Sequence, residues 1–152
     1  MTEVRPEDAV RLRAVTVEVA EGRSLDLVEL LKAWMVHVAK IESDMSLPSS
    51  DRSVWGAHDF IAALYLRDFL GVGLSDLDED LRARIESAVV EVDHRFSSYT
   101  EPDSSRVLQR VDRRKQPDPG WWWRRIPRSG PARDELMLYG GDDPEISRHS
   151  ET

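Results

Sequence analysis

The side chains best suited to binding form a run of three tryptophans followed by arginines. They are Trp121, Trp122, Trp123, Arg124, Arg125 and Arg128. An indole ring offers a large apolar surface with one hydrogen-bond donor, and a guanidinium can stack on it as a cation–π partner. Tryptophan and arginine are also enriched among the residues that dominate binding energy at protein interfaces. We therefore expect these six side chains to bind a partner.

Two other interpretations of this run stay open. One or two indoles could be buried and clamp the segment onto the rest of the chain, because burial is the most common fate of large apolar side chains. Aromatic side chains interleaved with arginine also suit unstacked bases and phosphates, so a nucleic-acid-associated factor is an alternative. Residues 1–105 hold 11 basic and 21 acidic side chains. Because that excess of negative charge repels phosphate, we do not expect a nucleic-acid partner.

The histidines suggest a second kind of chemistry. His37, His58 and His94 fall on three successive predicted helices, and Glu91 precedes His94 by three residues. Metal sites in helical bundles use inward-facing carboxylates and histidines, and the di-iron type needs the Glu-x-x-His spacing on two helices. This chain holds one copy of that spacing. A metal-assisted enzyme using these three histidines is therefore kept as an alternative, while we expect no metal and no cofactor.

The remaining polar residues point to no reaction. The acidic residues at positions 76–80 are placed to cap the start of a helix. A buried ion pair, which is usually structural, is expected among Asp59, Arg67, Asp68 and Arg95. The sequence holds no phosphate-binding glycine loop, no zinc-protease motif, no nucleophile elbow and no cysteine. We therefore favour a protein that is not an enzyme.

The distribution of charge suggests the kind of partner. Residues 106–133 hold 9 basic and 2 acidic side chains, whereas the segments on both sides of them are acidic. Such asymmetry bears on partners and not on the fold. We expect a protein–protein interaction module. One concrete version is a toxin-neutralising immunity or antitoxin-type protein, whose acidic surface steers it onto a basic toxin domain.

The sequence also bears on the compartment. The first 21 residues carry acidic side chains and lack the continuous apolar run of a secretory signal. No stretch approaches the roughly 18 consecutive apolar residues that a membrane-spanning helix needs. The absence of cysteine fits a reducing environment. We therefore expect a cytoplasmic protein without membrane contact, and the oligomeric state stays open.

Long predicted helices would position these groups. Apolar residues recur at three- and four-residue spacing over residues 27–45 and again over residues 77–99, which predicts two amphipathic helices. Residues 53–70 are apolar almost all round, and this pattern predicts a buried helix between the other two. We expect Gly71 and Gly73 to end that helix.

The other segments complete the predicted architecture. Residues 6–20 fit a helix, which we favour, although their alternating valines also fit a strand. A short helix is expected over residues 104–114. The sequence thus predicts an all-α protein: a small helical bundle over 1–116, and an irregular Trp/Arg/Pro-rich segment over 117–139 that packs on it. A disordered acidic tail is expected over 140–152.

The order of several features resembles a group of small, uncharacterised helical proteins of actinobacterial type. The features are Trp34 with Val38, Asp59-Phe60, Ala63-Leu64, Arg67-Asp68, Asp93-His94-Arg95-Phe96 and Trp122-Trp123-Arg124-Arg125-Ile126-Pro127. The resemblance spans roughly residues 25–130, and the tryptophan–arginine–proline end is its distinctive part. No activity is known for this group. The resemblance therefore implies a helical fold and no catalytic residue.

Overall fold

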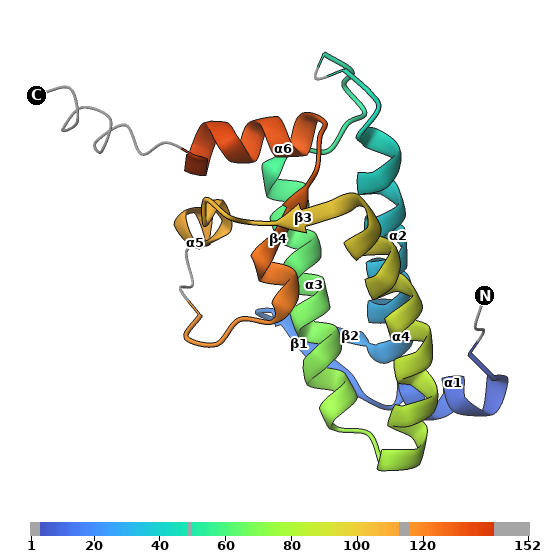
Figure 1. The fold of residues 1–152 in the computed structure, drawn as a ribbon. Helices are drawn as coiled ribbons and strands as arrows, with labels where there is room; N and C mark the ends of the chain where they lie inside the picture. The colour runs from blue at the N-terminus through green and yellow to red at the C-terminus, as the bar shows by residue number, and fades with distance from the viewer. Residues whose placement is uncertain (1–3, 49, 113–115, 142–152) are drawn as a thin grey trace, which may run out of the picture. The chain divides into compact units, whose positions relative to one another are not determined.

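The fold is mainly helical, and the residues that the structure describes also form two small antiparallel sheets. The structure is a computed structural model, which describes residues 4–48, 50–112 and 116–141 (Figure 1). The expectation of a helical protein is confirmed. The finer expectation of an all-α protein overlooked the two sheets.

Contacts along the chain divide it into two units. Unit 1 comprises Met1–Ala39 and Ala63–Ser98, and unit 2 comprises Lys40–Ala62 and Tyr99–Thr152. Each unit is built from two separate stretches of sequence, so neither can form from one continuous segment. The division predicted at residue 116 stays a prediction.

The helix α2 (Leu27–Asp44) begins with two reciprocal hydrogen bonds in unit 1. The main-chain N–H of Glu29 donates to Asp26 Oδ1 at 2.9 Å, and the main-chain N–H of Asp26 donates to Glu29 Oε1 at 3.3 Å. This capping box satisfies donors that the first turn of a helix leaves unpaired. The helix predicted over residues 27–45 is therefore confirmed, and its start has a local cause.

The helix α4 (Glu79–Tyr99) confirms the other amphipathic prediction, and most of it belongs to unit 1. The main-chain N–H of Leu81 donates to Asp78 Oδ1 at 2.8 Å, so a carboxylate caps this helix too. Large apolar side chains of α2, α3 and α4 are buried in unit 1. They are Leu30, Trp34, Val38, Leu64, Leu81, Ile85, Val89 and Phe96.

The helix α3 (Ala57–Ser75) is longer than predicted at its end, because Gly71 and Gly73 lie inside it. A Cβ atom on Gly73 would lie 2.3 Å from Leu27 Cδ2, which is closer than any real contact. Glycine at this position therefore allows a close approach of two segments of unit 1 and does not stop the helix. The prediction that the two glycines end α3 was wrong for this reason.

The first residues of unit 1 form a short helix followed by a hairpin. The helix α1 (Pro6–Arg13) precedes the antiparallel strands β1 (Thr16–Ala20) and β2 (Arg23–Asp26). The favoured helix over residues 6–20 is thus wrong beyond Arg13, and the alternation of valines identified the strand correctly. Branched side chains favour strands, and the hairpin turns at Gly22, whose φ is +73°.

Short elements make up the C-terminal part of unit 2. Strand β3 (Thr100–Pro102) pairs antiparallel with β4 (Arg125–Pro127), so that Thr100 lies opposite Pro127 (Figure 1). Between them the chain forms α5 (Val107–Val111) and a 3₁₀ turn, η1 (Trp121–Arg124). Pairing of the two strands brings the tryptophan run back to the residues that directly follow α4.

Unit 2 ends with α6 (Pro131–Leu136) and a π-helical stretch, η2 (Met137–Gly141). Gly130 precedes α6 with a φ of +96°, and a Cβ atom there would lie 2.7 Å from Met45 Cα. Only glycine fits such a position without strain. The disordered tail was predicted over residues 140–152. Its first two residues belong to η2, and residues 142–152 lie outside the described part of the chain. Across that described part, no helix has the length and apolar character needed to cross a membrane.

Candidate binding site in unit 2

The segment that carries the tryptophan run is held by main-chain hydrogen bonds within unit 2. The N–H of Asp103 donates to the carbonyl oxygen of Arg124 at 2.8 Å, and the N–H of Arg128 donates to that of Tyr99 at 3.1 Å. These two bonds extend the pairing of β3 with β4 at its two ends. The backbone of the run is therefore fixed, independently of its side chains.

Asp103 also fixes the start of α5. Its carboxylate accepts the main-chain N–H groups of Val107 at 3.0 Å and Leu108 at 2.9 Å. Both carboxylate oxygens are thus used in capping the helix. Arg106, the residue before α5, has φ +56° and ψ +38°. Residues other than glycine and asparagine rarely adopt this left-handed backbone conformation.

Two arginines of the predicted site bind main chain within unit 2. Arg125 donates from Nη2 to the Thr100 carbonyl oxygen at 2.8 Å and from Nε to Thr100 Oγ1 at 2.9 Å. Arg128 donates from Nε to the same carbonyl oxygen at 3.1 Å. These guanidinium groups tie β4 to the residue at which β3 begins. Their positions fit the clamp interpretation better than a partner-binding role.

The three tryptophans differ in exposure. Trp123 is 4% exposed, Trp121 is 40% exposed, and Trp122 is half-buried. The rings of Trp121 and Trp122 meet edge to face with centroids 5.7 Å apart. The Trp122 ring also covers Gly120, where a Cβ atom would lie 2.3 Å from Trp122 Cζ2. The run therefore presents one exposed ring and one half-buried ring beside a third ring that belongs to the core.

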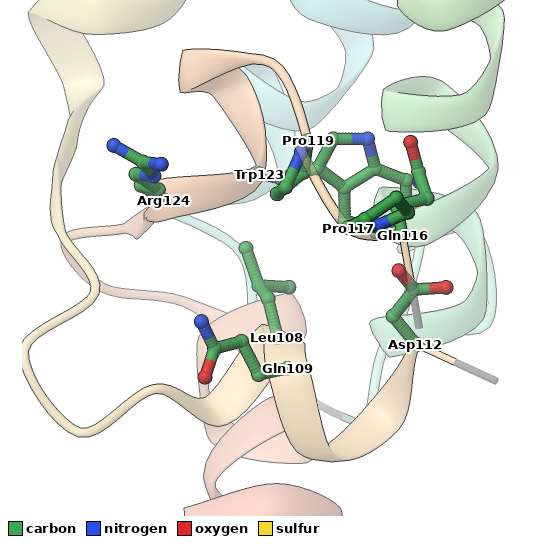
Figure 2. A pocket seen from close by; sticks show the side chains of 8 residues that line it. All are labelled: Leu108, Gln109, Asp112, Gln116, Pro117, Pro119, Trp123 and Arg124. Carbon is green, nitrogen blue, oxygen red and sulfur yellow. The ribbon is translucent and has the colours of Figure 1, made fainter. Parts of the chain in front are cut away.

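A hollow of about 350 Å³ opens beside Trp123. Figure 2 shows it between α5, which supplies Leu108 and Gln109, and the segment that carries Trp123 and Pro119. The residues that line it are Leu108, Gln109, Asp112, Gln116, Pro117, Pro119, Trp123 and Arg124. The lining is therefore mixed, with apolar rings and side chains next to amide, carboxylate and guanidinium groups.

A second hollow, of about 460 Å³, adjoins the first. Its lining comprises Pro102, Asp103, Ser104, Arg106, Gln109, Trp123 and Arg124. Gln109, Trp123 and Arg124 line both hollows. We call the two hollows together the Trp123 groove. The buried Asp112 lines only the first hollow, and the exposed Arg106 lines only the second, whereas the exposed Arg124 lines both.

Only part of this groove could be found from the sequence. Trp123 and Arg124 were predicted to bind a partner, and the structure places both in its lining. Arg106 and Gln109 were missed, because they lie in a segment whose only sequence signal was a short helix over 104–114. They reach the groove through the pairing of β3 with β4, which no local pattern indicates.

The three candidate metal-binding histidines have separate surroundings. In unit 1, the ring of His37 donates from Nδ1 to the Ala33 carbonyl oxygen at 2.7 Å, and His94 is exposed on α4. In unit 2, the exposed His58 ring lies 6.1 Å from the ring of Tyr139. Among the residues with described positions, no group of three or more His, Asp or Glu side chains is arranged to hold a metal ion.

The buried ion pair of unit 1 has a different acidic partner from those considered. Arg67 donates from Nε to Asp93 Oδ1 at 2.9 Å and from Nη2 to Asp93 Oδ2 at 3.0 Å. Trp34 Nε1 donates to the same Oδ1 at 3.0 Å. The prediction that Arg67 is paired was right, but the partner comes from α4. Asp93 lies on the apolar stripe between Val89 and Phe96, and this position was the signal that could have identified it.

The carboxyl groups of Asp8, Asp51 and Asp78 have lowered pKa values. The guanidinium of Arg84 donates two hydrogen bonds to Asp8, at 3.1 and 2.9 Å, and lowers the pKa of that carboxyl. Hydrogen bonds from the Ser53 hydroxyl and main chain lower the pKa of Asp51, and the main-chain N–H of Leu81 lowers that of Asp78. None of the three lines the Trp123 groove, and each shift has its cause in a hydrogen bond within the fold.

Comparison with known proteins gives no match to any family model, any curated protein or any solved structure. The chemistry of the Trp123 groove is therefore derived from its geometry alone.

Proposed function

We propose that this protein is a protein–protein interaction module without enzymatic activity, and that the Trp123 groove receives a short segment of its partner. The observation that carries this proposal is the position of Trp123. Its indole is 4% exposed and yet lines two adjoining hollows. Aromatic side chains of this kind, held firmly next to open volume, supply contact area with little loss of conformational freedom on binding.

The size and lining of the groove support a peptide segment as the ligand. Hollows of about 350 and 460 Å³ lie in the range of known ligand sites. Prolines, an indole and a leucine provide apolar contact, while Gln109 and Arg124 provide hydrogen-bond donors. A combination of apolar contact and few polar groups suits side chains of a polypeptide.

The six predicted binding residues divide into two groups under this proposal. Trp121, Trp122, Trp123 and Arg124 contact the partner. Arg125 and Arg128 hold β4 against β3 through the Thr100 carbonyl oxygen, and they act by positioning the other four.

A finer version of the proposal concerns the partner. Unit 1 holds 15 acidic and 9 basic side chains, which supports attraction to a basic protein. We propose that the partner is a basic toxin domain and that the protein neutralises it in the cytoplasm. Steering of this kind predicts an association rate that falls steeply as salt is added, whereas a rate insensitive to salt contradicts it.

Site-specific photo-crosslinking tests the interaction proposal. A benzophenone amino acid replaces Gln116, which lines the groove, and in a matched protein it replaces Arg52, which is exposed in unit 2 and lines neither hollow. In cells that make the protein naturally, we expect one protein to be cross-linked from position 116 and not from position 52. With that partner purified, the Arg124→Ala variant should bind it about tenfold or more weakly than the unchanged protein does.

Two results would contradict the proposal. Equal cross-linking from positions 116 and 52 would show that the groove selects no protein. Recovery of RNA or DNA in place of a protein would favour the nucleic-acid alternative. That alternative predicts binding to single strands that weakens steeply with salt and is lost when Arg124 and Arg125 are replaced by alanine.

A further inference from the structure

The two hollows of the Trp123 groove differ in charge. The first is lined by one acidic and one basic residue, Asp112 and Arg124, together with the apolar side chains of Leu108, Pro117 and Pro119. The second is lined by two arginines, Arg106 and Arg124, with one acidic residue, Asp103, and Ser104. The second hollow therefore has one arginine more than the first, and this favours a negative group of a ligand there.

The one carboxylate that lines the second hollow has its oxygens occupied. Asp103 accepts main-chain N–H groups of α5 through both Oδ1 and Oδ2. This carboxylate is therefore held at the start of α5, and the two arginines exceed it in number in the lining. A guanidinium presents a fork of donors that matches the two oxygens of a carboxylate.

The backbone of Arg106 adds a second observation. The residue has the left-handed conformation that favours glycine or asparagine, with φ +56°. Strained residues are concentrated at binding and catalytic sites, where the side chain is needed at a particular place. Here the strained residue is an arginine that lines the hollow beside a second arginine.

We infer that the second hollow is a carboxylate subsite, in which Arg106 and Arg124 bind the carboxylate of a partner segment whose neighbouring apolar side chain fills the first hollow. This inference rests on the proposed function, since the ligand is taken to be part of a protein. Gln109, Trp123 and Arg124 line both hollows, so one continuous segment of a ligand can extend from one hollow into the other.

Titration of the full chain with short peptides tests the subsite. The probes are acetyl-leucyl-glutamate amide, its neutral match acetyl-leucyl-glutamine amide, acetyl-glycyl-leucine with a free terminal carboxylate, and acetate alone. Binding is followed by NMR at the Trp123 indole N–H and the Gln109 side-chain amide. We expect the glutamate peptide to shift both signals and to bind about tenfold more tightly than its neutral match, because a charge-assisted hydrogen bond is lost in the latter.

Variants identify the groups responsible. Arg106→Asn removes the guanidinium but suits the left-handed backbone, so the protein stays folded. We expect this variant and Arg124→Gln each to weaken the glutamate peptide by about tenfold, and the matched control Arg52→Gln to leave it within about twofold. Tighter binding of the peptide with the free terminal carboxylate would also support the subsite and would identify a chain end as its ligand.

Three results would overturn the inference. They are equal binding of the glutamate and glutamine peptides, unchanged binding by Arg106→Asn, and acetate binding as tightly as the glutamate peptide. Its failure is distinct from failure of the proposed function. If Arg106→Asn leaves the cross-linked partner at position 116 unchanged, the interaction stands without the subsite. If the glutamate peptide binds as expected but position 116 captures no protein, the subsite stands and the interaction with a protein does not.

Discussion

Trp34 in unit 1 and Trp123 in unit 2 are almost equally buried but have different surroundings. Trp34 is 0% exposed, its Nε1 donates to Asp93, and its ring lies 5.3 Å from that of Phe96. Trp123 is 4% exposed and borders two hollows. Burial alone therefore does not separate a structural indole from a candidate binding indole. The open volume beside the ring does.

The arginines of the two regions differ in the same way. The guanidinium of Arg67 in unit 1 is paired with both carboxylate oxygens of Asp93, and its side chain is 10% exposed. Arg124 in unit 2 is exposed at the edge of the groove. Its main-chain carbonyl oxygen accepts a hydrogen bond from the N–H of Asp103, which fixes its backbone. The charge of the first arginine is used within the fold, whereas we propose that the charge of the second is used by a ligand.

The largest expected loss of stability comes from Asp93→Ala in unit 1. It leaves the buried guanidinium of Arg67 and the indole N–H of Trp34 without their acceptor, and losing one partner of a buried ion pair lowers the free energy of unfolding by about 3–5 kcal/mol. Urea denaturation measures this loss. Glu86→Ala, at an exposed position of the same helix, is the control and should change stability by no more than about 0.5 kcal/mol. Equal losses in the two variants would mean that the network does not stabilise the fold.

Replacing the tryptophans one at a time sharpens the comparison within unit 2. Trp123→Ala removes a core ring and should lower the free energy of unfolding by about 3–5 kcal/mol. Trp121→Ala removes a ring that is 40% exposed and should lower it by about 1 kcal/mol, mainly through the lost contact with Trp122. Thermal or urea unfolding of both variants checks the order. A Trp123→Ala variant as stable as Trp121→Ala would show that this ring does not belong to the core.

Two glycines with positive φ allow a test of the backbone in both units. Gly130→Ala in unit 2 should lower the free energy of unfolding by about 1–3 kcal/mol from strain alone, with a further loss because its Cβ meets the Met45 backbone. Gly22→Ala in unit 1 has the strain but no atom within 4 Å of the new Cβ. Chemical denaturation should therefore show a larger loss for Gly130→Ala. A larger loss for Gly22→Ala would contradict the close approach at Gly130.

The smallest expected effect is a pH dependence from unit 1. The pKa of Asp8 is below its ordinary value of 3.8 in the folded protein, because Arg84 donates hydrogen bonds to its carboxylate. Its stabilising contribution is therefore present above pH 3.8 and is lost as the pH falls through the lower folded value. Asp8→Asn should reduce stability at neutral pH, and the difference from the unchanged protein should shrink in acid. Urea titrations at pH 7 and at about pH 3 check this, with Glu86→Gln as a control that shows no such convergence.

The sequence predicted the long helices because their signal is local. Residues 27–45 and 77–99 repeat apolar side chains at helical spacing, and α2 and α4 follow these ranges closely. The strand at residues 16–20 was visible as the alternative to a helix, since its valines alternate. The choice between the two was wrong because pairing with β2, and not propensity, decided it.

The candidate site could be predicted only in part. A run of tryptophans beside arginines indicates binding, but no pattern tells which rings are buried or which guanidinium groups bind main chain. Arg125 and Arg128 have the same residue type as Arg124 but are used to hold β4. Arg106 and Gln109 carried no signal of binding, because their place in the groove depends on residues such as Trp123 that are distant in sequence.

The amino-acid sequence by itself determined the helical segments, the hydrophobic faces and the basic tryptophan-rich segment, because each depends on residues a few positions apart. The tertiary structure decided the partner of Arg67, the continuation of α3 through Gly73, and the groove beside Trp123. Each of these depends on how closely distant segments approach, and a close approach is a property of packing in three dimensions that periodicity along one chain does not encode.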